Sequence, residues 1–195
     1  MSDHAKRKKA AVQPPGPRSA SEMPVLTKHE KTLAWSVDTI GQAEHPDGSN
    51  RGPFVEFCQA HTWLKGSGWP WCAAFAVTAI EEGGLEDYPD KTAGAWDLLA
   101  RAKRRGWALG PTSGNVQPGD LVVFNIGSGH VGVVEKIAGG QVTSIDGNSG
   151  DQVARCTRPL SVVRGFVHWP ENMPAVKPSK RPVHQVVGSV SGRRR

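Results

Sequence analysis

Four residues of the chain have the types and the order of a thiol-based hydrolytic site. Cys72 follows a Gly-Trp-Pro-Trp turn and opens an apolar run, so we expect it at the N-terminus of a helix. The positive end of the helix dipole favours the thiolate, which is the nucleophilic form of cysteine. His130 opens a later hydrophobic strand and is placed to act as general base. Asp146 and Asn148 follow in a third segment, where either side chain could orient the imidazole.

Each of these residues also has an ordinary structural interpretation. Cys72 could be a buried thiol that packs as a small hydrophobic residue, and His130 could simply begin a strand. The Asp-Gly pair at Asp146 is a common hairpin signal. On a regular strand, Asp146 and Asn148 would face the same side, so their spacing does not decide which one orients His130.

The residues around the cysteine predict how a substrate would be held. Trp69 and Trp71 give Cys72 a rigid aromatic approach that could line a substrate groove. The backbone N–H of Cys72 is the expected oxyanion donor, and Asn50 is a candidate for a second donor. The alternative for Asn50 is a role in turn geometry, since it lies in a Gly- and Pro-containing loop.

The elements that must position these residues are helices in the first half of the chain. Thr27 and Glu30 form a capping box before a helical pattern that can end at Gly41. Pro53 suits the first position of a second helix that reaches about His61. The third helix starts at Cys72 and stops at Gly83-Gly84. Thr92 is predicted to cap the fourth, which ends at Gly106 and turns four residues inward: Ala95, Trp96, Leu99 and Ala102.

From Asp120 to Trp169 the pattern changes to Val, Ile and Phe runs separated by Gly-rich turns. This pattern predicts an antiparallel meander of about four to six strands. Helices followed by strands indicate an α+β fold, in which N-terminal helices, one of them beginning at the nucleophile, pack on the meander. A helix-start cysteine followed by a strand histidine, an acid and an amide is the papain-like order.

These segments resemble the CHAP family, the cysteine, histidine-dependent amidohydrolases/peptidases. The resemblance is carried by Trp71-Cys72-Ala73-Ala74-Phe75, Pro118-Gly119-Asp120, Gly129-His130-Val131-Gly132-Val133-Val134 and Asp146-Gly147-Asn148, with the Glu44–Gly52 loop before them. It spans roughly residues 28–169. It implies a papain-like fold that cleaves amide bonds of peptidoglycan, as in phage endolysins and bacterial cell-wall hydrolases.

The net charge of +6 belongs to the two ends of the chain. Residues 1–21 hold five Lys or Arg and one Asp, and residues 171–195 hold six Lys or Arg and one Glu, so residues 22–170 carry −3. We therefore predict a basic disordered N-terminal tail (1–21), a catalytic domain (22–170) and a basic C-terminal tail (171–195). The tails could attract anionic wall polymers or a membrane surface, whereas the acidic middle argues against specific nucleic-acid binding.

Composition narrows the remaining possibilities. With 195 residues and 37% hydrophobic content, the chain suits one domain with extensions. It has no apolar run long enough to span a membrane and no apolar leader. Three cysteines without a CxxC pair predict neither a disulfide framework nor a zinc site, and we read Cys58 and Cys156 as packing residues. The Glu44–Asn50 loop lacks the alternating acids of a calcium loop, so we expect no metal and no cofactor.

The sequence as a whole predicts a monomeric peptidoglycan hydrolase that uses Cys–His catalysis, with a phage endolysin as the first expectation. Such a protein would be made in the cytoplasm without a leader and would act on the wall after release. One alternative is a virion-associated lysin held in its particle by the basic tails. Another is a non-catalytic binding module that keeps the fold, although the intact Cys72, His130 and Asp146 set argues against it.

Overall fold

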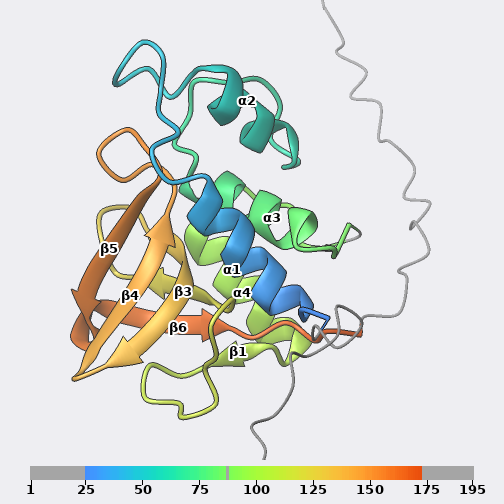
Figure 1. Cartoon of the computed structure of the whole chain (residues 1–195), viewed down its shortest axis with the longest axis vertical. Helices are drawn as coiled ribbons and strands as arrows, with labels where there is room; N and C mark the ends of the chain where they lie inside the picture. The colour runs from blue at the N-terminus through green and yellow to red at the C-terminus, as the bar shows by residue number, and fades with distance from the viewer. Residues whose placement is uncertain (1–24, 87, 173–195) are drawn as a thin grey trace, which may run out of the picture.

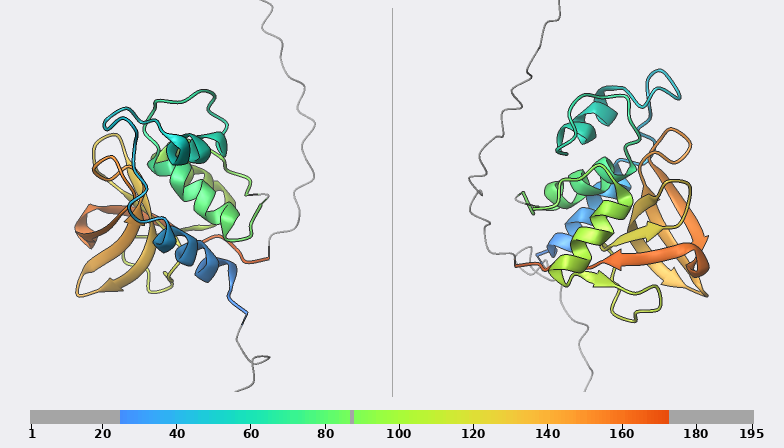
Figure 2. Two further views of the ribbon diagram at one scale, coloured as in Figure 1. Left: turned by 45° about the horizontal axis from the view of Figure 1, so that its top comes forward. Right: turned by 180° about the vertical axis from the view of Figure 1, so that it is seen from behind.

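The protein folds into a layer of helices against a layer of antiparallel strands (Figures 1 and 2). The computed structural model describes residues 25–86 and 88–172. The helices are α1 (Lys28–Asp38), α2 (Pro53–Ala60), α3 (Cys72–Glu82) and α4 (Ala95–Arg105). In Figure 1, α1 and α3 lie side by side next to the sheet, and α2 lies above them, away from the strands.

Local sequence features account for three of the four helices. Thr27 accepts a hydrogen bond from the Glu30 amide, and the Glu30 carboxylate accepts one from the Thr27 amide, so the predicted capping box starts α1. Pro53 is the first residue of α2. Ten of the eleven residues of α3 are buried, which makes it the central helix that the apolar run predicted.

The fourth helix differs in detail from its prediction. Gly94, not Thr92, is its N-cap, and the Thr92 hydroxyl instead accepts a hydrogen bond from the Gly94 amide. Leu98 is buried where Trp96 was expected, and Trp96 is 39% exposed. The indole of Trp96 can remain near the surface because its Nε1 donates to the Phe124 carbonyl. The helix ends at Gly106 in the left-handed conformation, as predicted.

The sheet has six strands in the order β1-β6-β2-β3-β4-β5, all paired antiparallel. The strands are β1 (Ala108–Leu109), β2 (Leu121–Phe124), β3 (His130–Ala138), β4 (Gln141–Asp146), β5 (Ala154–Pro159) and β6 (Val163–Val167), with a 3₁₀ turn at Leu160–Val162 before β6. The predicted meander is therefore β2 to β5. The last strand returns to the far side of β2, and β1 pairs with it at the edge.

Both faces of the sheet pack apolar side chains. One face joins the helices in the main core, to which Val131, Val133 and Ile145 belong. The other face has a smaller cluster around Phe124 and Val134. His130 lies at the start of β3 opposite Phe124, and the two rings stack with centroids 6.1 Å apart.

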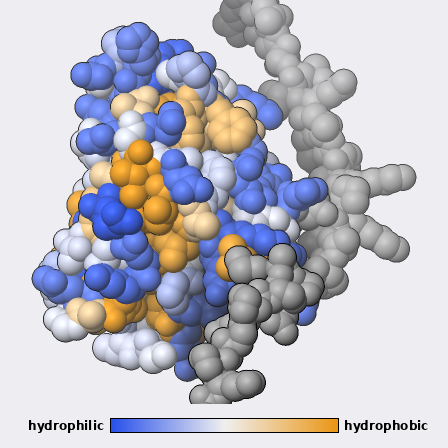
Figure 3. Space-filling view, viewed as in Figure 1, coloured by the Kyte–Doolittle hydropathy of each residue, from blue (hydrophilic) through white to orange (hydrophobic). Residues whose placement is uncertain are grey.

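The α+β prediction, with the cysteine at a helix start against an antiparallel sheet, is confirmed. The predicted N-terminal tail and nearly all of the C-terminal tail lie outside the described residues. Glu171, which the sequence assigned to that tail, contacts the first residues of α1 through its carboxylate. In the described ranges no helix has the length and apolar character to cross a membrane. Hydrophobic side chains gather in the middle of one face, among mostly hydrophilic neighbours (Figure 3).

Candidate active site

Cys72 is the first residue of α3 and is 7% exposed. Trp71, the N-cap residue, makes no side-chain bond to the first turn of the helix. The amides of that turn have no partner within the helix, because an α-helix leaves its first N–H groups unpaired. The backbone at Cys72 can therefore offer hydrogen bonds to a developing oxyanion.

His130 lies between Cys72 and Asp146. Its Nε2 is 2.9 Å from Oδ2 of Asp146, and it also interacts with the thiol of Cys72. Burial of the ring lowers the pKa of His130, but hydrogen bonds and charge from Asp146 and Cys72 outweigh burial and raise that pKa to about 9. The arrangement therefore favours an imidazolium beside Cys72. Because Nε2 is bound to Asp146, Nδ1 is the ring nitrogen that can exchange a proton with Cys72.

The Asp146 carboxylate is fully buried and has polar partners on both oxygens. The Ser144 hydroxyl donates to Oδ1 at 2.6 Å. Oδ2 accepts from Arg158 on β5 as well as from His130. A buried carboxylate is costly unless its oxygens have polar partners, and Ser144, Arg158 and His130 supply them here.

A glycine on the neighbouring strand makes room for this carboxylate. A Cβ atom at Gly132 would lie 1.9 Å from Oδ1 of Asp146 and 3.1 Å from the Cβ of Ser144. Gly132 and His130 are two residues apart on β3 and so face the same side of the sheet. Within the Gly-His-Val-Gly sequence, His130 thus supplies the imidazole, and Gly132 leaves the space that the Asp146 carboxylate occupies.

Asn148 has a different neighbour from Asp146. It lies beyond the end of β4 with a φ of 56°, and its Nδ2 donates to Oδ1 of Asn50 at 3.2 Å. Asn50 also has a positive φ, of 52°. Of the two predicted orienting residues, Asp146 is the one in contact with His130. Asn148 instead connects the end of β4 to the Glu44–Gly52 loop, and this contact brings the predicted oxyanion candidate Asn50 to the same side of the site.

Trp71 does not line a groove, contrary to our expectation. Its side chain is fully buried, and its Nε1 donates to Oε1 of Glu44 at 2.9 Å. The other oxygen of Glu44 accepts from the Asn50 amide at 2.6 Å. Trp71 therefore fixes the loop that carries Asn50. Trp69 is half-buried and is the one tryptophan of the pair that remains available to a substrate.

The same contacts bear on metal binding. Both carboxylate oxygens of Glu44 are already used by Trp71 and Asn50, so the Glu44–Asn50 loop offers little to a cation. Elsewhere in the described structure, His29, Asp120 and His168 bring three ligand-type atoms within 4.8 Å of one another. Residue spacing contains no indication of this cluster, because its members are far apart along the chain.

Cys58 and Cys156 lie among packing contacts, and neither is a neighbour of His130 in sequence. Cys58 is buried in α2, and burial raises the pKa of its thiol to about 12. Cys156 lies on β5, with its sulfur 3.1 Å from the Ser149 hydroxyl. All three cysteines are free. The interpretation of Cys58 and Cys156 as packing residues agrees with these surroundings.

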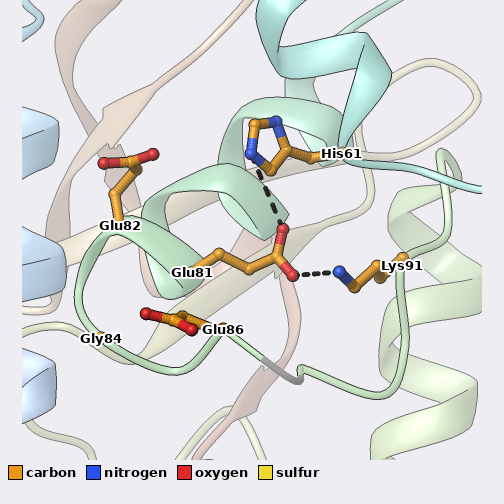
Figure 4. Close-up of a pocket in the computed structure, with 6 residues that line it drawn as sticks. All are labelled: His61, Glu81, Glu82, Gly84, Glu86 and Lys91. Atoms are coloured by element: carbon orange, nitrogen blue, oxygen red, sulfur yellow. Dashed lines mark ion pairs between the residues drawn. The ribbon is translucent and has the colours of Figure 1, made fainter. Parts of the chain in front are cut away.

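A separate pocket lies at the opposite end of α3 from Cys72 (Figure 4). It has a volume of about 410 Å³ and is lined by His61, Glu81, Glu82, Gly84, Glu86 and Lys91. Glu81 points between His61 and Lys91 and forms an ion pair with Lys91. The pocket contains none of the predicted catalytic residues.

The family comparison agrees with this geometry. The family model of the CHAP domain matches residues 64–148, a segment that includes Cys72, His130 and Asp146. Residues 64–148 are thus similar to a CHAP domain. The resemblance carried by the cysteine and histidine motifs is thereby confirmed.

Comparison with individual proteins gives weaker likenesses. No curated protein sequence matches the chain. A solved structure described as "The crystal structure of Ly7917" is similar over 72% of this chain, with 14% identity and a TM-score of 0.42. "The crystal structure of Ly7917 with the hydrolyzing product of MDP" has 15% identity over the same share and a TM-score of 0.40. The chain spans 62% of the length of each of these structures.

Sequence reasoning missed Arg158 and Ser144 in the CHAP site. Ser144 is two residues before Asp146 on β4 and so faces the same side, a relation that the strand pattern contains. Arg158 had no such indication. The register of β4 and β5 pairs Asp146 with Ala154 and Arg158 with Val142, so the long Arg158 side chain reaches Asp146 from a different pair of the ladder, a contact that residue types alone do not indicate.

Proposed function

We propose that this chain is a peptidoglycan hydrolase that cleaves an amide bond of the bacterial cell wall through Cys72 and His130. The observation that carries the proposal is His130, held by Asp146 on one side and in contact with Cys72 on the other. The CHAP domain supplies the substrate class, since the family resemblance implies amide hydrolysis in peptidoglycan.

In the proposed reaction the thiolate of Cys72 attacks the carbonyl carbon of the scissile amide. The carbonyl oxygen becomes an oxyanion that accepts from the backbone N–H of Cys72, and Asn50 is the second donor that we propose. When the tetrahedral intermediate collapses, the C–N bond breaks. The leaving amine takes the proton from Nδ1 of His130, and a thioester remains on Cys72.

Water completes the reaction with the same groups in the reverse proton role. Neutral His130 takes a proton from water, the hydroxide attacks the thioester carbon, and the C–S bond breaks. The product leaves as a carboxylate, with Cys72 again a thiolate and His130 again protonated. Throughout, Asp146 fixes the ring through Nε2 and stabilises the positive charge.

Within this function, the scissile bond is either the muramoyl–alanine amide or a peptide bond of the stem or cross-bridge. We propose a phage endolysin that reaches the wall after release from the cytoplasm. A virion-associated lysin is the second form of the same activity, with the basic tails as its attachment. A non-catalytic module would not need an ionised acid held on the histidine beside a cysteine.

The test is mass spectrometry of soluble fragments released from purified peptidoglycan. The wild-type protein should release fragments with one new amine and one new carboxylate per cut, and their masses identify the bond. Cys72→Ser should release none, because a hydroxyl is a poor nucleophile beside a base suited to a thiol. Cys156→Ser is the matched control and should act like wild type. Equal release by Cys72→Ser would contradict the proposal.

A further inference from the structure

A second cluster of ionisable side chains, His29, Asp120 and His168, lies at the opposite end of β2 from His130. Asp120 immediately precedes β2, whereas His130 pairs with Phe124, the last residue of that strand. His29 comes from the first turn of α1, and His168 directly follows β6. Three segments that are distant in sequence therefore place an imidazole, a carboxylate and a second imidazole together.

The contacts converge on one oxygen of Asp120. Oδ2 accepts from the Gln117 amide at 2.9 Å, so this oxygen is already satisfied. Oδ1 lies 2.9 Å from Nδ1 of His168 and 3.2 Å from Nε2 of His29. All three ligand-type atoms lie within 4.8 Å of one another. Ligands bound at about 2.0–2.2 Å around a tetrahedral Zn²⁺ are themselves about 3.3 Å apart, close to the two distances of 2.9 and 3.2 Å from Oδ1 of Asp120 to the imidazole nitrogens.

The Nε2 atom of His29 is the observation that points to a ligand. His29 is 98% buried, since its exposed fraction is 2%, yet Nε2 makes no well-aligned hydrogen bond among the described residues, although Oδ1 of Asp120 lies 3.2 Å away. The opposite nitrogen, Nδ1, lies 2.7 Å from Oε1 of Glu171. When Nδ1–H donates to this carboxylate, Nε2 presents a lone pair toward Asp120. A lone pair facing a carboxylate is unfavourable unless a cation lies between them.

A carboxylate behind a ligand histidine is the usual support of a zinc site, because it fixes the tautomer and makes the other nitrogen a better ligand. Glu171 is placed to do this for His29. Trp169 stacks on the same imidazole, with ring centroids 3.7 Å apart, and holds its plane. His168 is 39% exposed, so the cluster is open to solvent on one side and an ion can reach it.

We propose that His29 Nε2, Asp120 Oδ1 and His168 Nδ1 bind one Zn²⁺ ion. Two imidazole nitrogens and one carboxylate oxygen are the donor types that zinc prefers, and water can fill a fourth position on the exposed side. The ion ties the start of α1 to the beginning of β2 and the end of β6. Its role is structural, because the site is separated from Cys72 by the length of β2.

A proton is the competing occupant of the same space. A doubly protonated His29 could form ion pairs with both Asp120 and Glu171, and the cluster would then hold these segments together without a metal. The two cases differ in their response to zinc. A zinc site adds binding free energy to folding, so the melting temperature rises with zinc concentration, whereas a protonated clamp gains nothing from the ion.

The experiment uses the full chain, stripped with EDTA and titrated with ZnCl₂. Calorimetry should give one bound ion per chain, and thermal unfolding should shift upward by several degrees. His168→Ala should lose both effects while retaining the wild-type circular dichroism spectrum. Glu171→Gln should weaken binding by about 10–100-fold, the usual effect of losing a carboxylate behind a ligand. His45→Ala, which changes an exposed histidine of a loop, should bind as wild type.

Zinc could also bind the active-site thiolate, so the titration is repeated with Cys72→Ser. The site proposed here should remain in that variant with unchanged stoichiometry. Because the readouts are heat and melting temperature, they do not depend on the proposed hydrolase function. Absence of both effects in wild type, or full retention of both in folded His168→Ala, would overturn the assignment.

Discussion

Oδ2 of Asp146 is shared by His130, whose Nε2 lies 2.9 Å away, and by the guanidinium of Arg158. The Asp146 carboxylate and the Arg158 guanidinium have opposite effects on the pKa of the histidine. Asp146 stabilises the imidazolium and raises its pKa, whereas Arg158 competes for the same carboxylate charge. The pKa of His130 thus depends on Asp146 of β4 and on Arg158 of β5. Substitution of Asp146 should lower this pKa, and substitution of Arg158 should raise it.

Asp146→Asn should lower both the rate and the alkaline limit of hydrolysis. The pKa of His130 is raised to about 9, so wild-type activity should fall as pH rises through that value and the imidazolium is lost. Without the carboxylate the pKa falls, and the alkaline limb moves toward neutral pH. The rate at the optimum should drop by about 10⁴-fold, the cost of losing the orienting acid in a comparable triad. A pH–rate profile tests this, and an unmoved alkaline limb would refute the role of Asp146.

Arg158→Gln should shift the alkaline limb in the other direction. With the competing cation removed, the full Asp146 charge acts on His130, so its pKa rises and activity persists to higher pH. Stability should fall by about 1.5–3 kcal/mol, the range for a hydrogen bond to a charged group. The control is Arg155→Gln on the same strand, which removes an exposed pair with Glu135 and should leave the pH profile unchanged. A downward shift in Arg158→Gln would contradict the shared-carboxylate account.

Gly132→Ala should disable the site by steric displacement alone. The added methyl group would lie 1.9 Å from Oδ1 of Asp146, so the carboxylate must move away from His130. Overpacking of this kind costs about 1–3 kcal/mol in stability, and the rate should fall toward that of Asp146→Asn. Gly110→Ala, where a Cβ meets no atom within 4 Å, is the matched control. Normal hydrolysis by Gly132→Ala would mean that Asp146 need not stay in place.

Asn148→Gly should cost much less activity than Asp146→Asn. Glycine tolerates the positive φ of this position, so the variant removes the amide contact with Asn50 without straining the backbone. If Asn50 is an oxyanion donor, its looser position should reduce the rate and leave the alkaline limb near pH 9. Comparing the two variants on one soluble substrate checks this order. A larger loss at Asn148, with a shifted limb, would assign it the orienting role.

The sequence was informative where one residue type has one dominant local role. The Thr27–Glu30 capping box, Pro53 at a helix start and Gly106 at a helix end each act through neighbouring backbone atoms. The same holds for Cys72, whose place at the start of an apolar helix is a local property. For these positions a short window of sequence contains the physical cause.

Tertiary contacts decided the rest. The fully buried side of α1 presents polar residues, His29, Thr32 and Ser36, because the helix packs against α3 and Asp120. Hydrophobic spacing could not predict this face. Trp71 was expected to line a substrate groove, because nothing in its own segment indicates that its indole bonds to Glu44, 27 residues away. The return of β6 to the side of β2 likewise depends on strand pairing, which residue patterns do not encode.

The central claim is that Cys72 and His130 act as one catalytic unit, and a double-mutant cycle on a soluble peptidoglycan fragment tests it most directly. Cys72→Ala and His130→Ala should each reduce the rate by at least about 10³-fold, and the double variant should be no slower than either single variant, because removing one member already disables the pair. Multiplicative losses in the double variant, or substantial hydrolysis by Cys72→Ala, would contradict the account.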